Sequence, residues 1–237
     1  MTEPPELSIV MPVYNEAGAI EGVVREWAAE IERLGIAYEM LLYDDGSRDG
    51  TAAALGRLAA ANGRVIARAH ANRGHGPTIV RGYGEARGTW IFQTDSDGEM
   101  PAAGFESLWV RRADYDLLVG RRGGRRLSAG RFLLTFGSRR LIALAFGRAI
   151  RDVNSPYRLM RGSWLRERVL PFLPPGTAVP NIAICGIAAR SHARVHETVV
   201  PYVPRRQGRS SVSLRRAITL AWRGVIESLR IMRAVSR

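Results

Sequence analysis

The feature that most constrains the fold is the alternation of short apolar runs with helical patterns in the first half of the chain. The apolar runs predict strands and the spaced apolar positions between them predict amphipathic helices. The expected strands are 7–13, 38–43, 65–70, 90–94 and 116–120. The expected helices are 15–34 with Asn15 as N-cap, 51–61, one after the glycine-rich loop that follows residue 70, and 102–112. This order predicts an α/β fold, a mostly parallel sheet flanked by helices.

Polar clusters directly follow three of the expected strands. The clusters are Tyr14-Asn15-Glu16, Asp44-Asp45 and Asp95-x-Asp97-x-Glu99. Ligands of such sheets bind beyond the carboxyl ends of the strands. We therefore expect the three clusters to converge on one site.

The third cluster places carboxylates at alternate positions just past a strand. Hard oxygen ligands of this kind suit Mg²⁺ or Mn²⁺, which substrate phosphates would also hold. A solvated acidic turn is the alternative. An EF-hand is excluded because Gly104 stands where the loop needs Glu, and a dinucleotide fold because GxGxxG does not follow the first strand.

Charge is distributed unevenly around the net value of +13. Up to residue 119 there are 18 acidic residues and 11 arginines, whereas from residue 120 there are 24 arginines and 4 acidic residues. An acidic half that could hold a metal is thus joined to a basic half that could face phosphates. All 35 basic residues are arginine, which a genomic bias would explain, but such a bias would not explain the asymmetry.

Other features narrow the class of protein. A single cysteine, Cys185, excludes an intrachain disulfide and a cysteine-rich zinc site. Residues 1–7 lack the basic region of a signal peptide, so a cytoplasmic location is expected.

The C-terminal region contains two candidate amphipathic helices, 132–146 and 214–232. The charges of 214–232 rule out a helix that spans a bilayer. Basic helices with one apolar face can lie on anionic membranes, on the inner face in this case, and packing or dimer contact is the alternative. The expected division is a catalytic domain over 1–213 and an amphipathic basic helix over 214–237.

A set of motifs runs through residues 7–213 in a fixed order. They are Val10-Met-Pro-Val-Tyr-Asn-Glu16, Tyr43-Asp-Asp-Gly-Ser-Arg-Asp-Gly-Thr51, Asn72-Arg-Gly-His-Gly76 with Arg81-Gly82, Thr94-Asp-Ser-Asp-Gly-Glu-Met-Pro101, Gly120-Arg-Arg122, Asp152-Val-Asn-Ser155 and Arg205-x-x-Gly208-x-Ser210. Together they resemble the GT-A family-2 glycosyltransferases, particularly the dolichol-phosphate mannose synthase and bactoprenol glucosyltransferase branch.

The resemblance implies a GT-A fold and an inverting, metal-dependent glycosyltransferase. It would move a sugar from a UDP- or GDP-sugar to an acceptor, with a polyprenyl phosphate expected. By resemblance, the base and ribose would be lined by Pro12, Tyr14, Glu16 and Asp45, and the metal and diphosphate would be bound by Asp95, Asp97 and Glu99. Donor or acceptor phosphates would meet Arg122, Arg131 and Arg205, with Ser210 close by.

Three positions depart from the family pattern. His75 stands where Lys is frequent, Pro156 replaces a glycine, and Cys185 falls near a position that is acidic in many relatives.

The nature of the acceptor follows from the scarcity of acids. A hydroxyl acceptor needs a general base, whereas a phosphate arrives already anionic. After residue 120 only Asp152 is an acidic residue within a motif, which favours a lipid phosphate. The alternatives are a soluble enzyme that glycosylates a hydroxyl, and a catalytically silent protein that binds a nucleotide-sugar or RNA. No nucleic-acid motif is present, so no nucleic-acid partner is expected.

Overall fold

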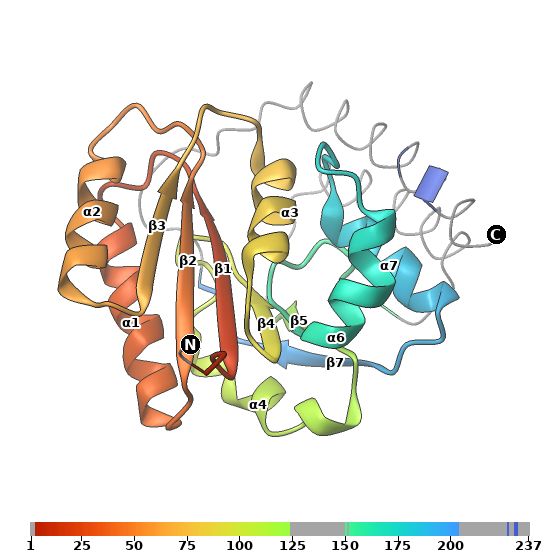
Figure 1. Ribbon diagram of the computed structural model, residues 1–237. Coiled ribbons are helices and arrows are strands. Elements are labelled where there is room, and N and C mark those ends of the chain that lie inside the picture. The colour runs from red at the N-terminus through yellow and green to blue at the C-terminus, as the bar shows by residue number, and fades with distance from the viewer. Residues whose placement is uncertain (1–2, 124–149, 151, 204–226, 228–229, 232–237) are drawn as a thin grey trace.

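The computed structural model describes residues 3–123, 150, 152–203, 227, 230 and 231 (Figure 1). The predicted site residues Arg131, Arg205 and Ser210 lie outside these ranges, as do helix 132–146 and most of 214–232. The two-part division of the chain at residue 213 therefore stays a prediction.

The architecture is a seven-stranded sheet in the order β3-β2-β1-β4-β6-β5-β7. The strands are β1 (Leu7–Val13), β2 (Tyr38–Asp44), β3 (Val65–Ala69), β4 (Trp90–Gln93), β5 (Leu117–Arg122), β6 (Arg158–Arg161) and β7 (Val195–Val200). β1 pairs in parallel with β2 and β4, β2 with β3, and β5 with β7. Only β6 among the described strands runs antiparallel to its neighbours, β4 and β5. The expected mostly parallel α/β sheet is confirmed.

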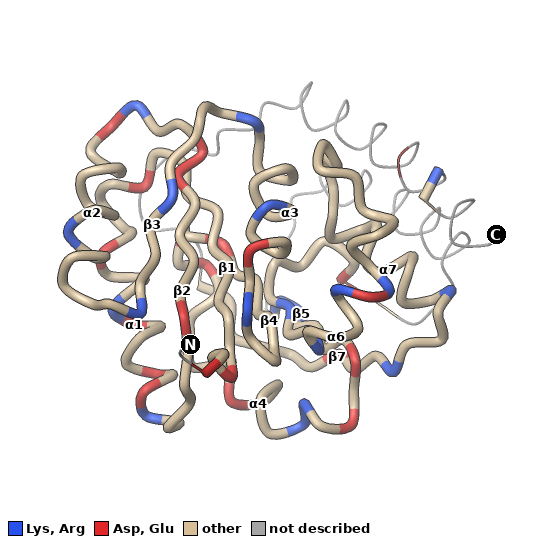
Figure 2. Tube along the Cα trace, viewed as in Figure 1, with Lys and Arg blue, Asp and Glu red and all other residues tan. Residues whose placement is uncertain are grey.

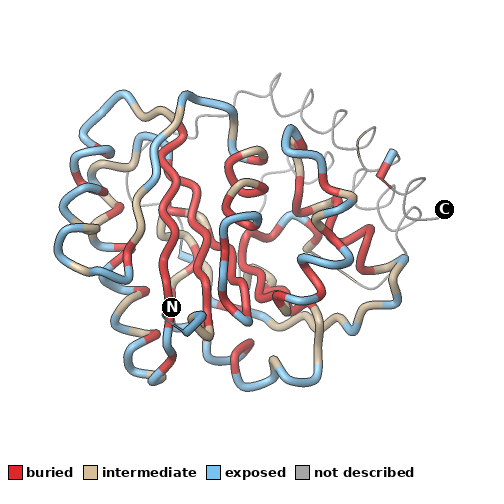
Figure 3. Tube along the Cα trace, in the orientation of Figure 1, coloured by how far each residue is buried: buried red, intermediate tan, exposed pale blue. Residues whose placement is uncertain are grey.

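Helices cover both faces of the sheet (Figure 1). The longer ones are α1 (Ile20–Arg33), α2 (Thr51–Ala61), α3 (His75–Glu85) and α7 (Pro180–Arg190). One apolar cluster joins alternate residues of the central strands to α1 and α2, and a second cluster joins the other face to α3 and α7. Charged residues lie mainly on the helices and loops around the sheet (Figure 2), and the central strands are buried (Figure 3). Strands covered on both faces are expected to be continuous apolar runs, as β1 is.

Shorter helical segments fill the connections. They are η1 (Ala102–Gly104), α4 (Glu106–Trp109), η2 (Arg112–Asp114), α6 (Gly162–Trp164), the π-helical turn η3 (Leu165–Val169) and η4 (Leu170–Phe172). The single helix expected over 102–112 is therefore wrong, because the chain there forms three short turns.

The predicted start of the first helix is also wrong. Helix α1 begins at Ile20 with Ala19 as its N-cap residue. Asn15 instead adopts a left-handed backbone with φ 54°, and its Oδ1 accepts a hydrogen bond of 2.8 Å from the Arg48 N–H. The side chain that could cap a helix joins two loops at the carboxyl edge of the sheet.

Candidate active site

The loops after β1 and β2 are joined by hydrogen bonds at the carboxyl edge of the sheet. The Asn15 N–H donates to Ser47 Oγ at 2.9 Å, and the Glu16 N–H donates to Thr51 Oγ1 at 2.9 Å. Tyr14 stands at the end of β1 with 37% of its surface exposed, whereas Pro12 is buried inside the strand. The predicted nucleotide-binding residues Tyr14 and Glu16 thus share one loop, and Tyr14 offers an exposed ring on which a planar base could stack.

Asp45 holds the glycine-rich loop that leads into α3. Its side chain is buried, with Oδ1 accepting from the Arg73 N–H at 2.7 Å and Oδ2 from the Gly74 N–H at 3.0 Å. Both carboxylate oxygens therefore bind backbone amides, so Asp45 shapes the loop. Each oxygen has a second lone pair that a ligand could use.

The three carboxylates that follow β4 line a common pocket. Asp95, Asp97 and Glu99 face this pocket together with Thr94, Met100, Arg122 and Pro156. The turn that presents them is tight: Gly98 has φ 69°, and Asp97 Oδ1 accepts from the Glu99 N–H at 3.0 Å. Within the described ranges, no three His, Cys, Asp or Glu side chains form a cluster that could hold a metal ion.

His75, the first residue of α3, lies against the carboxylate loop. Its Nε2 is 3.0 Å from Asp95 Oδ1. Burial works to lower the pKa of His75, but the nearby carboxylates, chiefly Asp95, outweigh this effect and raise that pKa. Burial likewise works to raise the pKa of Asp95, but His75 and Arg122 outweigh it and lower that pKa. A protonated His75 would supply part of the positive charge that a lysine would carry there.

Arg122, at the end of β5, joins the carboxylate loop to the loop before β6. Its Nη1 is 3.8 Å from Asp152 Oδ2, and the two side chains are only 15% and 18% exposed. The Asp152 N–H donates to Glu197 Oε1 at 2.9 Å, which ties this loop to β7. The structure therefore brings together five predicted site residues: Asp95, Asp97, Glu99, Arg122 and Asp152.

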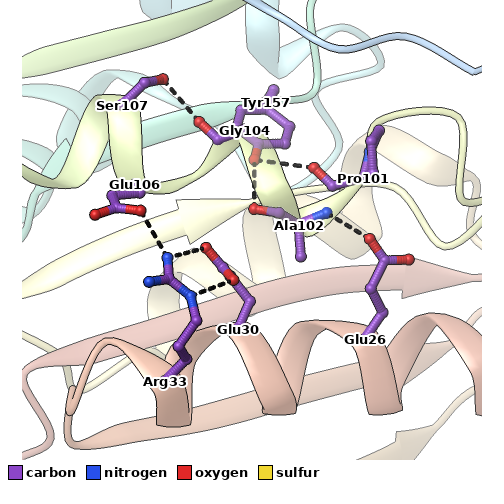
Figure 4. Close-up of polar contacts among 9 residues, drawn as sticks. All are labelled: Glu26, Glu30, Arg33, Pro101, Ala102, Gly104, Glu106, Ser107 and Tyr157. Atoms are coloured by element: carbon purple, nitrogen blue, oxygen red, sulfur yellow. Dashed lines mark hydrogen bonds and ion pairs between the residues drawn. The ribbon is translucent and has the colours of Figure 1, made fainter.

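The segment that leaves the carboxylate loop is anchored from behind (Figure 4). Glu26 Oε1 accepts from the Ala102 N–H at 2.8 Å, and the Tyr157 hydroxyl donates to Pro101 O at 3.2 Å. Arg33 binds Glu30 on its own helix and Glu106 on α4. Helix α1 and Tyr157 thus fix the position of the loop that carries the acidic residues.

The described C-terminal residues also contact the domain. The Val203 N–H donates to Glu99 O at 2.8 Å, so the chain passes beside the carboxylate loop two positions before Arg205. Glu227 Oε2 accepts from the Ala178 N–H at 2.9 Å, and Ile231 is buried in the apolar cluster on the α3 and α7 face. No helix in the described part of the chain is long and apolar enough to cross a membrane.

Sequence reasoning missed Tyr157 and Arg158. Both are buried, and both act through contacts with residues distant in the chain. Their only signal is their position directly after the Asp152–Ser155 motif.

Comparison with known proteins identifies the family. The model of glycosyl transferase family 2 matches residues 8–169. The chain belongs to this family. Its fold is the GT-A fold expected from the motifs.

Family-2 relatives in bacteria extend the match. The chain is 31% identical over 221 residues to undecaprenyl-phosphate 4-deoxy-4-formamido-L-arabinose transferase of Pseudomonas fluorescens (strain SBW25), covering 90% of this chain and 62% of that protein. It is 32% identical over 228 residues to the Klebsiella pneumoniae transferase with the same name, covering 94% of this chain and 68% of the relative. The chain thus spans less than two thirds of the Pseudomonas relative.

Solved structures share the fold of this family-2 chain at low identity. Mannosyl-3-phosphoglycerate synthase from Rubrobacter xylanophilus matches with a TM-score of 0.63 and 18% identity, covering 98% of this chain and 75% of that chain. Glucosyl-3-phosphoglycerate synthase from Mycobacterium tuberculosis, in complex with Mn²⁺, UDP-glucose and phosphoglyceric acid, matches with a TM-score of 0.66 and 18% identity, covering 96% and 80%.

Proposed function

We propose that this protein is an inverting, metal-dependent glycosyltransferase that moves a sugar from a UDP- or GDP-sugar to a polyprenyl phosphate. The observation that carries the proposal is that Asp95, Asp97, Glu99 and Arg122 line one common pocket. Carboxylates on one side and a guanidinium on the other suit a bound cation and a diphosphate. The family match supports the reaction class.

The donor nucleotide lies along the carboxyl edge of β1 and β2. Tyr14 stacks on the base, and Glu16, Asp45 and Pro12 line the base and ribose. The hydrogen bonds that the loop after β1 donates to Ser47 Oγ and Thr51 Oγ1 support this placement, because they hold Tyr14 and Glu16 in a fixed loop.

A divalent ion, Mg²⁺ or Mn²⁺, fits the chemistry of the carboxylate loop. Asp95, Asp97 and Glu99 line the pocket without forming a three-ligand cluster, so they would hold the ion together with oxygens of the donor diphosphate, since hard oxygen donors are the ligands such ions prefer. When bound, it neutralises the charge that develops on the departing diphosphate. The structural relative from Mycobacterium tuberculosis, solved with Mn²⁺ and UDP-glucose, supports a divalent ion in this fold.

The acceptor approaches from the side of Arg122 and Asp152. A phosphate oxygen attacks the anomeric carbon, the bond from that carbon to the diphosphate breaks, and the nucleoside diphosphate leaves with the electron pair. Attack opposite the leaving group inverts the configuration. Arg122 binds the phosphate, together with Arg131, Arg205 and Ser210, which lie outside the described residues.

Two observations favour a lipid phosphate. The relatives' names specify undecaprenyl phosphate. Asp152 lies beside Arg122, and this ion pair keeps the Arg122 guanidinium at the acceptor side, where it could bind a phosphate. Contact of the arginine-rich C-terminal segment with an anionic membrane surface would bring the enzyme to such an acceptor.

The experiment is a transfer assay with the purified protein, Mn²⁺ or Mg²⁺, and a panel of UDP- and GDP-sugars. Undecaprenyl phosphate in detergent is the acceptor, and glycerol, free sugars and undecaprenol are the comparison acceptors. We expect a glycolipid only with the lipid phosphate, and none with EDTA. Transfer to hydroxyl acceptors but not to the phosphate would refute the proposal.

A further inference from the structure

Arg158 is a buried arginine near the site whose hydrogen-bond partners among the described residues are all uncharged. Its side chain is fully buried in β6. Nε donates to Ser155 O at 2.6 Å, Nη2 donates to Val153 O, and Nη1 lies 3.2 Å from Cys185 Sγ. None of the ion pairs of the described residues includes this guanidinium. Burial disfavours a charge that has no charged partner, so the hydrogen bonds of this guanidinium have to account for its place in the core.

The contacts of Arg158 concentrate on the loop that carries Asp152. Val153 and Ser155, whose carbonyls accept from it, stand one and three positions after Asp152. The Ser155 N–H in turn donates to Asp152 O at 3.1 Å. A planar guanidinium that binds two carbonyls fixes their separation and direction. The fork therefore determines the turn that presents Asp152.

Cys185, on α7, provides the third contact. Burial raises the pKa of the Cys185 thiol, although Arg158 opposes this effect. The thiol therefore stays neutral and leaves the guanidinium positive. Its Sγ also donates to Val153 O at 3.6 Å, so the thiol and the guanidinium hold the same carbonyl.

Other bonds hold the same loop to the neighbouring strands. Ser155 Oγ donates to Gly120 O at 2.5 Å, and the Gly120 N–H donates to Tyr157 O at 2.8 Å. Gly120 lies two positions before Arg122 on β5. These bonds hold the loop with Asp152 against the strand with Arg122, and Arg158 binds the carbonyls of the same loop.

We propose that Arg158 is a positioning residue that holds Asp152 opposite Arg122 and so sets the geometry of the acceptor side. The inference rests on the proposed function, in which these two residues face the acceptor. It assigns to Arg158 an effect on acceptor use that does not extend to donor binding.

The test compares Arg158→Lys with Arg166→Lys. Arg166 also binds two backbone carbonyls, with Nη2 at 3.0 Å from Ala86 O and 2.8 Å from Gly88 O, but at the amino end of β4, away from the site. Lysine keeps the charge in both variants and loses the planar fork. For Arg158→Lys we expect kcat/KM for undecaprenyl phosphate to fall several-fold, as much as in Asp152→Asn, because the variant misplaces Asp152. Donor Kd should stay within about twofold, because Asp152 is displaced on the acceptor side only. Arg166→Lys should keep both values, because the carbonyls that Arg166 binds lie away from the site.

Four outcomes bear on the proposal through activity. Arg158→Lys should retain more transfer than Arg158→Met, because the ammonium still donates to one carbonyl. Equal kcat/KM in Arg158→Lys and Arg166→Lys would overturn the proposal, as would a parallel loss of donor binding. If the Arg158 variants do not fold, Cys185→Val against Cys185→Ser decides. Serine keeps an acceptor for the guanidinium, so only the valine variant should lose acceptor kcat/KM, and wild-type values in both would overturn the proposal.

A readout that does not need transfer separates this inference from the proposed function. If wild-type protein transfers nothing to undecaprenyl phosphate, the proposed function fails. Amide hydrogen exchange then tests whether Arg158 positions the loop with Asp152. Arg158→Lys should speed amide exchange in the peptide 152–157, and Arg166→Lys should speed it near residues 86–89 instead. Unchanged exchange in 152–157 would overturn the positioning role.

Discussion

Carboxylates in the motifs divide into those that shape loops and those that face the pocket. Asp44 accepts from the Ser47 N–H, and Asp45 accepts from the Arg73 and Gly74 N–H groups, so both build the loops on which a nucleotide would rest. Asp95 and Asp97 line the pocket. Substitutions in the first group should therefore affect folding and binding together, and substitutions in the second should affect chemistry with the fold intact.

Asp97→Asn tests the second group. We expect transfer to fall at least about a hundredfold, because loss of one charge-stabilising group at the reacting centre typically has this effect. Circular dichroism and the unfolding temperature should stay near wild type, since the side chain lies in a loop. The control is Asp114→Asn, an exposed carboxylate on η2, which should keep full activity. Near-native turnover of a folded Asp97 variant in the presence of EDTA would refute the metal assignment.

Asp152→Asn separates the two acceptor classes. With a phosphate acceptor we expect a loss of only several-fold, because the residue positions a group and removes no proton. Exposed Glu167 on η3 offers a control, and Glu167→Gln should be silent. Strong transfer by wild type to a hydroxyl, abolished in Asp152→Asn, would make Asp152 a general base.

The sequence marks the residues that lie in ordered motifs but not those that act through tertiary contacts. Asp95, Asp97, Glu99, Arg122 and Asp152 were predicted, and the structure brings them together. Tyr157 and Arg158 could not be predicted, because their partners, such as Pro101 and Cys185, become neighbours only in the folded chain.

Elements of the first half followed from periodicity, whereas three later ones did not. β6 is short, and its two apolar residues stand between two arginines, of which Arg158 is fully buried. β7 is an edge strand of mostly intermediate burial. Helix α7 is apolar almost all round, because it packs on several sides, and it starts with Pro180 at its first turn. Periodicity detects a single buried face and fails for such elements.

The glycines of α3 provide a test at the scale of an element. A Cβ at Gly76 would lie 2.3 Å from Thr177 O and 2.4 Å from Ala178 O, whereas a Cβ at Gly84 would meet nothing within 4 Å. We expect Gly76→Ala to lower the free energy of unfolding by about 1–3 kcal/mol through overpacking. Gly84→Ala should raise it by about 0.5–1 kcal/mol, because alanine favours the helix. Urea unfolding of both variants checks this, and an equal effect would contradict the close approach of α3 to the 177–178 backbone.

At the scale of the whole molecule, the arginine-rich C-terminal segment has two expected roles. Ile231 and Glu227 contact the domain, which supports packing. The arginines at 215, 216 and 223 could face an anionic surface, with each basic residue contributing about 1 kcal/mol near it. Both roles are compatible, because they use different side chains.

Two variants separate these roles. Ile231→Ala should lower the free energy of unfolding by about 2–4 kcal/mol, as for other buried large-to-small changes, and leave liposome binding unchanged. Arg215, Arg216 and Arg223 replaced together by Ser should weaken binding to anionic liposomes and leave stability unchanged. Exposed Val110→Ala is the control for the first variant. Equal liposome co-sedimentation by wild type and the triple variant would exclude the membrane role of these arginines.

Removal of residues 214–237 combines the two effects. We expect lower stability and weaker liposome binding, with donor affinity changed less than either. Donor titration, thermal unfolding and co-sedimentation of the same preparation measure all three. A truncated protein that binds liposomes as well as the full chain would favour packing or dimer contact as the role of the segment.

The reversed direction of β6 has a consequence for how this scaffold can change over evolution. The chain leaves the carboxyl edge of the sheet after β5 and enters β6 from that same edge, so residues 123 and 152 bound a segment that begins and ends on the active-site side. Longer loops between fixed ends cost little extra closure entropy, about 0.6 kcal/mol for each doubling of length. By this measure, the connection between β5 and β6 tolerates a segment of another length. Grafting it from a homologue with another acceptor is a direct route to new acceptor specificity on an inherited donor site.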